Sequence, residues 1–290
     1  MSEGDRHVPF RLDMPESWTT SVVFASPHSG RDYPASFLRA SVLDERAIRT
    51  SEDAFVDQLF GAGPRFGAPL LAARVPRAFI DLNRSADELD PALIEDVRRV
   101  THNPRVSSGL GVVPRVVANG RSIYQGKLSK REAEDRLARY WHPYHTRLQA
   151  LLDESHARFG ETILVDCHSM PHEAIDSICH GRGLRPDIVL GDRFGAAAGN
   201  EVVEQVEAAF ASVGLVVTRN APFAGAFTAQ HYGRPSREQH VVQVEIDRAL
   251  YMDEQTIEPN ANFEEFKAVI TRVVALLAAF GAQQVPLAAE

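Results

Sequence analysis

Four polar groups whose side chains suit catalysis or metal binding follow apolar runs in the chain or end them. They are His28, Asn83 with Arg84, His168 and Glu245. Two imidazoles and a carboxylate are a typical ligand set for catalytic zinc, which keeps a fourth position open for water. Zinc makes water a nucleophile near neutral pH, and a separate glutamate can then move its proton. An arginine adds a planar fork that binds a carboxylate. These residue types therefore indicate a metal-dependent hydrolase that acts on an acyl bond in an anionic substrate.

Each of these residues also has a structural interpretation, which the spacing alone leaves open. His28 can cap a turn, and Glu52 or Asp53 can be an acidic first residue of a helix, where the helix dipole favours negative charge. Arg84 can pair with nearby surface carboxylates. Glu245 alternates with apolar neighbours and can be the solvent-facing residue of an edge strand. No His-x-x-Glu pair follows the first histidine.

The apolar runs beside these residues are predicted to be strands of one sheet. Ile163–Val165 is an unbroken apolar run before His168, typical of a strand buried on both faces of a parallel sheet. Ser21–Ala25 similarly precedes the first histidine, and Val241–Ile246 contains the glutamate. Because the carboxyl ends of parallel strands share the edge where open α/β sheets bind ligands, the polar groups are expected to meet there.

Helical patterns alternate with strand patterns along the chain. Helices are predicted over Leu43–Arg49, Asp53–Phe60, Ser129–Phe159, Gly195–Gly214 and Asn262–Gly281, and further strands at Leu70–Val75, Ala78–Ile80, Ile188–Leu190 and Leu215–Thr218. Pro143 is expected to break or kink the longest helix. Ala86–Tyr124 and Phe223–Gly233 are predicted to be mostly loop. The pattern predicts an α/β protein, one domain over residues 1–290, with a mixed or largely parallel central sheet flanked by helices.

The composition is ordinary for a globular protein, with 44% hydrophobic and 24% charged residues among 290. A net charge of −8 argues against a general nucleic-acid-binding protein, which carries a basic patch. The polar N-terminus lacks the apolar core of a signal peptide, and Ala268–Phe280 is too short and amphipathic to span a bilayer. Two cysteines, Cys167 and Cys179, form no disulfide framework, and a cytoplasmic location is expected. The sequence gives no indication of oligomeric state.

Several stretches, taken in order, resemble the N-formylglutamate amidohydrolase family. They are Ser26–Gly30, Glu52–Phe60, Phe79–Arg84, Val165–Ser169, His231–Gly233 and Val244–Glu245 through Tyr251–Asp253. Together they cover most of the chain from Val22 to Asp253. The family looks like a distant relative of zinc carboxypeptidases and aspartoacylases, so the resemblance implies a zinc-carboxypeptidase-like, phosphorylase/hydrolase-like fold.

The resemblance also implies a metal centre. It implies one zinc per chain, held by His28, Asp53 and His168, with another divalent metal as an alternative. Asp53 fits the family's aspartate position better than Glu52, because it keeps the register to the apolar residues that follow. The two neighbours remain alternatives at this point.

The remaining site residues are assigned by the same resemblance. Glu245 matches the catalytic glutamate, while Asn83 and Arg84 match the groups that hold the substrate carboxylate. Tyr232, in a glycine-rich stretch, is assigned to the pocket wall. Two further histidines near the site, His172 and His180, are expected to be solvated loop residues.

The implied reaction is hydrolysis of the amide bond of an N-acyl amino acid, foremost N-formyl-L-glutamate to formate and L-glutamate in histidine degradation. Zinc is expected to polarise the acyl carbonyl and activate water, with Glu245 as general base and then general acid. The expected partner is a small anionic substrate derived from an amino acid, with no nucleic acid and no membrane. The alternatives are a deacylase or peptidase acting on another N-acyl amino acid, and a non-catalytic binding protein that retains the fold.

Overall fold

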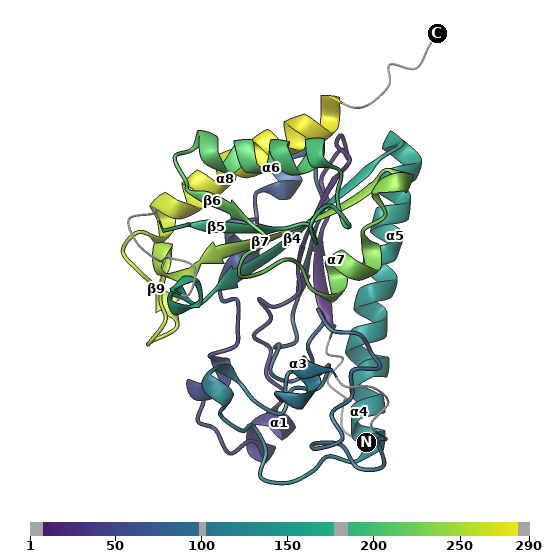
Figure 1. Cartoon of the computed structure of the whole chain (residues 1–290), viewed down its shortest axis with the longest axis vertical. Helices are drawn as coiled ribbons and strands as arrows, with labels where there is room; N and C mark the ends of the chain where they lie inside the picture. The colour runs from purple at the N-terminus through teal and green to yellow at the C-terminus, as the bar shows by residue number, and fades with distance from the viewer. Residues whose placement is uncertain (1–7, 99–102, 177–184, 284–290) are drawn as a thin grey trace.

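A seven-stranded mixed sheet forms the centre of the structure, a computed structural model that describes residues 8–98, 103–176 and 185–283 (Figure 1). The strand order is β1 (Phe10–Asp13), β3 (Leu70–Ala73), β2 (Val22–Ser26), β4 (Thr162–Met170), β7 (Gln239–Asp247), β5 (Ile188–Gly191) and β6 (Val217–Arg219). Neighbours among β3, β2, β4 and β7 are parallel, whereas β1 runs antiparallel to β3 and β5 antiparallel to β7. The predicted α/β class with a mixed, largely parallel sheet is confirmed. Cys179 and His180 lie outside the described residues.

Helices cover both faces of this sheet. On one face, α5 (His142–Phe159) packs against β2 and β4, while α6 (Asn200–Ser212) and α8 (Phe263–Gln283) pack together on the other (Figure 1). Leu164 belongs to the apolar core beneath α5, and its neighbour Val165 belongs to the core beneath α6 and α8. Successive side chains of a strand point to opposite faces, so a strand covered on both sides is apolar at every position.

The predicted helix over Ser129–Phe159 is present but contains a π-helical turn. Its first part, α4 (Lys130–Arg136), begins as predicted, because the Ser129 side chain accepts a hydrogen bond from the backbone N–H of Glu132. The π-helix η4 (Leu137–Trp141) follows and leads directly into α5, where Pro143 lies in the first turn. Proline is tolerated where its missing N–H has no regular partner, so the chain stays helical through the position where a break or kink was predicted.

Other predicted elements differ in extent. The helices predicted at Leu43–Arg49 and Asp53–Phe60 shrink to η1 (Ala47–Arg49) and α2 (Val56–Leu59). Ala78–Ile80 is a buried turn, and the stretch predicted as loop over Phe223–Gly233 contains α7 (Phe227–Tyr232). The remaining elements are α1 (Ala35–Ala40), η2 (Gly63–Phe66), α3 (Pro104–Ser107), η3 (Ala118–Gly120), η5 (His172–Ile175), η6 (Pro235–Arg237), η7 (Arg248–Leu250), β8 (Met252–Asp253) and β9 (Glu258–Pro259).

An irregular lobe lies beyond one end of the sheet, at the bottom of Figure 1, where α1, α3 and α4 are found. It includes Ala86–Tyr124, whose described residues contain only the short helices α3 and η3, in agreement with the prediction of loop with short elements. A cavity lies between this lobe and the carboxyl edge of the sheet, because residues of both line it. Within the described ranges, no helix is both long and apolar enough to cross a membrane.

Candidate active site

Three of the predicted site residues meet at the carboxyl edge of the sheet. His28 follows β2, His168 lies near the end of β4, and Asp53 comes just before α2. Each offers one ligand atom, these atoms lie within 4.8 Å of one another, and every residue is at most 2% exposed. Gly30 allows the turn after β2 to close, because a Cβ there would lie 2.0 Å from the carbonyl oxygen of Val75. The strand ends therefore bring together a buried group of the kind that binds metal.

Both histidines present the same ring nitrogen to this group. The Nε2 of His28 lies 2.7 Å from Asp81 Oδ1, and the Nε2 of His168 lies 3.1 Å from Asp166 Oδ2. With a metal bound, these carboxylates would keep the proton on Nε2 and leave each Nδ1 as the ligand atom. The two Nδ1 atoms lie 3.3 Å and 2.9 Å from Asp53 Oδ2, in the order His28 and His168. The arrangement is the carboxylate–histidine pairing that orients histidines as metal ligands.

Asp53 is held as a carboxylate anion. Burial opposes its charge, but the hydrogen bond from His168 and the nearby His28 keep its pKa well below the usual range. Its second oxygen, Oδ1, accepts a hydrogen bond from Arg248 Nη2 at 2.9 Å. Arg248 is itself fixed by a bond of 3.2 Å to the Ser169 hydroxyl. One oxygen of Asp53 is thus committed to arginine, while the other faces the histidines.

The choice between the two neighbouring acids is clear in this geometry. Glu52 points elsewhere: it accepts a hydrogen bond from the Tyr33 hydroxyl and pairs with Arg49 at 3.0 Å. Asp53, and not Glu52, belongs to the group with both histidines. His172 lies apart from the group and pairs with Asp247 at 2.7 Å.

Glu245 is buried beside this group and is not on an edge strand. It lies on β7, between β4 and β5, and is directly paired with His168 in the parallel register. Its side chain lines the cavity and accepts a hydrogen bond from Gln243 Nε2 at 2.9 Å. Burial raises the pKa of Glu245 to about 7. A carboxyl group with a pKa near neutrality can both accept and donate a proton at the pH of most reactions.

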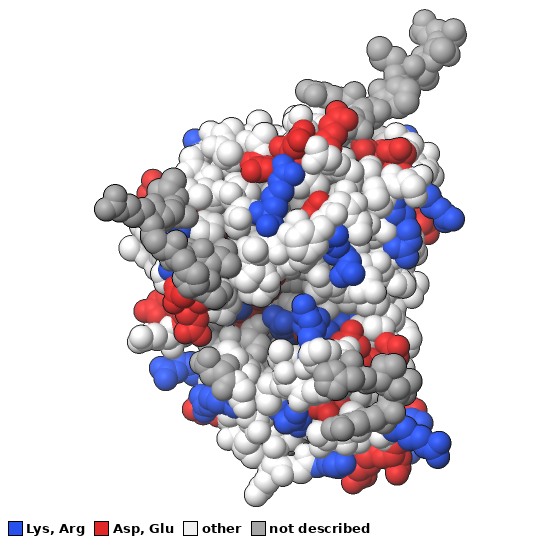
Figure 2. Space-filling model, viewed as in Figure 1, with Lys and Arg blue, Asp and Glu red and all other residues white. Residues whose placement is uncertain are grey.

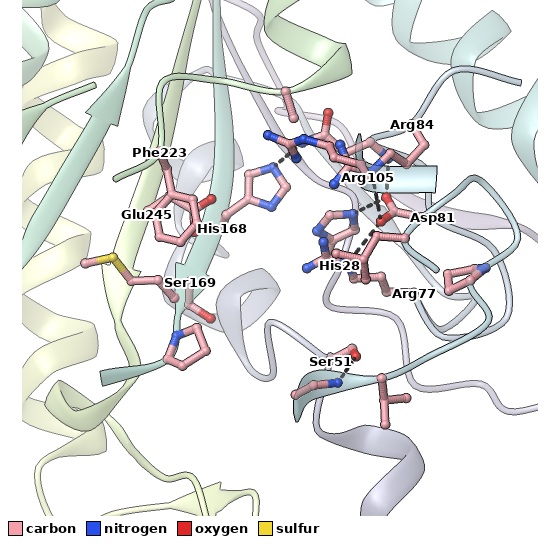
Figure 3. A pocket seen from close by; sticks show the side chains of 18 of the residues that line it. His28, Ser51, Arg77, Asp81, Arg84, Arg105, His168, Ser169, Phe223 and Glu245 are labelled. Carbon is pink, nitrogen blue, oxygen red and sulfur yellow. Dashed lines mark hydrogen bonds and ion pairs between the residues drawn. The ribbon is translucent and has the colours of Figure 1, made fainter. Parts of the chain in front are cut away.

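The cavity of about 420 Å³ contains most of the predicted site residues. Figure 3 shows the pocket, with Glu245 and Phe223 on one side of His168 and Arg84 and Arg105 on the other. In the space-filling view, Lys and Arg side chains gather at a hollow in the middle of the visible face, although the net charge of the chain is −8 (Figure 2). The cavity therefore suits an anionic ligand.

Asn83 and Arg84 both line the cavity but differ in what they can still bind. The Asn83 side chain is engaged within the protein: Oδ1 accepts from the N–H of Thr228 at 2.8 Å, and Nδ2 lies 3.5 Å from Asp166 Oδ2. Arg84 is buried, its Nε has no hydrogen-bond partner among the described residues, and the Nε lies 3.9 Å from Asp81 Oδ2. Its ion pair is this long contact with Asp81 in the interior and not a surface pair, so its guanidinium remains available to a ligand.

Tyr232 is not among the residues that line this cavity, which corrects its assignment to the pocket wall. It lies behind the site on α7, 2% exposed, and its hydroxyl is 2.8 Å from His145 Nδ1. His145 Nε2 in turn lies 2.9 Å from the carbonyl oxygen of Leu82, and Trp141 donates a hydrogen bond to the carbonyl of Arg84. The π-helical turn and α5 therefore hold the backbone that carries the arginine.

We expect this support to weaken in acid. Burial lowers the pKa of His145 to about 3, so the folded protein keeps the ring neutral while the unfolded chain takes up a proton below about pH 6.5. Stability is therefore lost as the pH falls from about 6.5 toward 3. Between pH 7.5 and pH 5 the loss from this residue is about 2 kcal/mol.

Urea unfolding of wild type and His145→Gln at both pH values measures this effect, because a glutamine Nε2 can still donate to Leu82. The variant is expected to lose about 2 kcal/mol less than wild type on acidification. Equal losses in the two proteins would contradict a neutral, buried His145.

A second cluster of potential ligands, Glu161, Glu238 and His240, involves the opposite ends of β4 and β7. His240 Nδ1 accepts a hydrogen bond from the N–H of Gly199 at 3.1 Å. Its neutral ring must then carry the proton on Nε2, which faces both carboxylates at 3.5 Å. A protonated Nε2 cannot bind metal, so this cluster is an internal hydrogen-bond network.

Sequence reasoning did not assign several residues that complete the site. They are Arg77, Asp81, Arg105, Asp166, Gln243 and Arg248. Asp166 could have been found, because it lies two positions before His168 on the same face of β4. Arg105 and Arg248 carry no comparable local signal, since only the tertiary fold brings them to the cavity.

Comparison with known proteins identifies the family of this chain. The family model described as N-formylglutamate amidohydrolase matches residues 20–252. The chain is similar to N-formylglutamate deformylase of Pseudomonas aeruginosa, 30% identical over 271 residues, and to that of Pseudomonas putida, 27% identical over 270; each match covers 91% of this chain and 94% of the relative. The crystal structure of N-formylglutamate amidohydrolase from Ralstonia eutropha is similar at a TM-score of 0.88 and 35% identity, covering 95% of this chain and 99% of that one. The chain therefore belongs to the N-formylglutamate amidohydrolase family.

Proposed function

We propose that this protein is a zinc-dependent amidohydrolase that converts N-formyl-L-glutamate and water to formate and L-glutamate. The observation that supports the proposal most strongly is that three kinds of group lie around the same cavity. The His28–Asp53–His168 group, the buried Glu245 and the cationic Arg84 all border it or lie at its wall. The names of the relatives from both Pseudomonas species support N-formylglutamate as the substrate.

The donor set fits a zinc ion. His28 Nδ1 is buried and has no hydrogen-bond partner among the described residues, and His168 Nδ1 and Asp53 Oδ2 lie beside it. Two imidazole nitrogens and one carboxylate oxygen are a ligand set that zinc accepts while keeping a position for substrate or water. When bound there, zinc would supply Lewis acidity toward the formyl carbonyl and the attacking water.

Glu245 then moves the proton. As a carboxylate it accepts a proton from the attacking water, and as the acid it donates that proton to the amide nitrogen when the carbon–nitrogen bond breaks. A pKa near 7, raised by burial, suits both steps. Arg84 binds a carboxylate of the substrate and so places the formyl group beside Glu245. Asn83 acts from the cavity wall by holding Asp166, the carboxylate beside His168 Nε2, in place.

The proposal is tested by incubating the zinc-loaded protein with N-formyl-L-glutamate and measuring both products. We expect formate and L-glutamate in equal amounts, and no product after the metal has been removed with a chelator. If the protein binds zinc but releases no formate, the substrate assignment is wrong, and a panel of other N-acyl amino acids follows. If it takes up no divalent metal at all, the mechanism itself is wrong.

A further inference from the structure

Arg105 is an arginine at the cavity for which the reaction described so far has no use. It lies on α3 in the irregular lobe and lines the cavity together with Arg84. Both also line an adjoining hollow that opens outward, so they lie along one continuous path from the metal group. Repulsion from Arg105 contributes, after the larger effect of burial, to a lowered pKa of Arg84. The two guanidinium groups therefore lie close enough to repel each other. No carboxylate in the described ranges forms an ion pair with both of them.

The other arginines of the cavity are already paired. Arg77 donates to Asp81 at 3.0 Å, and Arg248 donates to Asp53 at 2.9 Å. In contrast, no hydrogen bond or ion pair joins the Arg105 guanidinium to any residue in the described ranges. Figure 3 shows Arg105 beside Arg84, on the opposite side of His168 from Glu245. Arg84 and Arg105 are thus the two cations of the cavity that a ligand can engage.

We propose that Arg105 binds the γ-carboxylate of the substrate while Arg84 binds its α-carboxylate, which makes the site selective for N-formyl amino acids with two carboxylates. This inference rests on the proposed function and deepens it by naming the residue that binds the side-chain carboxylate of the substrate. N-formylglutamate carries two anionic groups, and one guanidinium can bind only one of them through a paired hydrogen bond.

The assignment of each carboxylate follows from the covalent structure of the substrate. The α-carboxylate is attached to the same carbon as the nitrogen of the bond that breaks, so it must lie close to the metal group. Arg84 meets this condition: its Nε is 3.9 Å from Asp81, which bonds His28 at 2.7 Å. The γ-carboxylate lies two methylene groups farther out. Arg105 has no contact with the metal group and borders the outer hollow, where the side chain would extend.

The test compares the binding of L-glutamate with that of its two monoamides, L-glutamine and L-isoglutamine, to the zinc-loaded protein by calorimetry. Glutamine lacks the γ-carboxylate and isoglutamine lacks the α-carboxylate, so each amide removes one proposed ion pair. Wild type is expected to bind glutamate about tenfold more tightly than glutamine. This factor corresponds to the lower end of the range for a hydrogen bond between charged groups, because Arg105 is exposed. Arg105→Gln should remove this preference but keep the preference over isoglutamine, and Arg84→Gln should do the reverse.

Arg105→Lys, which keeps the charge without the planar fork, should restore part of the preference. Arg39→Gln, an equal charge change on exposed α1, serves as the matched control and should behave as wild type. The inference is overturned if wild type binds glutamine as tightly as glutamate, or if Arg105→Gln weakens all three ligands equally or none. Formate release by wild type is measured separately: selective glutamate binding without any hydrolysis would reject the proposed reaction and keep the two-carboxylate site.

Discussion

Replacing Glu245 by glutamine is expected to lower kcat for formate release by about 10²- to 10⁴-fold, the usual contribution of a general acid–base group. The change removes the proton acceptor but alters little else. A glutamine Oε1 at this position can still accept the hydrogen bond that Gln243 Nε2 donates at 2.9 Å. Metal content and thermal stability should therefore stay close to those of wild type, and initial rates with zinc-loaded protein measure the loss.

Glu207→Gln is the matched control for this substitution. Glu207 lies on α6, where it pairs with Arg219 away from the cavity, and the change removes the same charge. The control should keep wild-type kcat. A loss of less than tenfold in Glu245→Gln would show that another group moves the proton.

Replacing His168 by alanine is expected to abolish metal binding, and activity with it. The removal of an outer partner of a metal ligand typically lowers affinity by about 10- to 100-fold, so the removal of a ligand should lower it further. Elemental analysis after purification should find about one zinc per wild-type chain, as a single three-residue site predicts, and none in the variant.

Because His168 also contacts Asp53 and Asp166 in the interior, its removal takes one partner from each of two buried carboxylates and can destabilise the fold. Asp53→Asn keeps the shape of the side chain and provides a second test, with metal loss again expected. His156→Ala, on the outer side of α5, makes the same chemical change as His168→Ala and should keep its zinc. Retention of stoichiometric metal by both site variants would reject this centre.

The sequence predicted the core of the site because strand ends are recognisable. Unbroken apolar runs indicate strands covered on both faces, and parallel strands deliver the residues at their ends to one edge. This reasoning brought together His28, His168 and Glu245, which the structure places around one cavity wall. The resemblance to the family then favoured Asp53 over its neighbour, and the geometry agrees.

What could not be predicted depends on contacts between distant parts of the chain. Arg248 reaches Asp53 across 195 positions, and nothing local to either residue indicates that pair. Tyr232 lies in a stretch that resembles the family, but α7 turns its ring toward His145 and the core. Pro143 was expected to break or kink a helix, and the π-helical turn that precedes it in the structure has no simple sequence signal.

The irregular lobe has a consequence for how such a protein changes during evolution. The proposed metal ligands and Glu245 come from the sheet, from the turn after β2 and from the residues just before α2, whereas Arg105 comes from a segment with few regular elements. Loops tolerate substitutions, insertions and deletions far better than buried strands do. Mutations in the lobe can therefore change which N-acyl amino acid the protein accepts, while the proposed metal ligands and Glu245 stay the same.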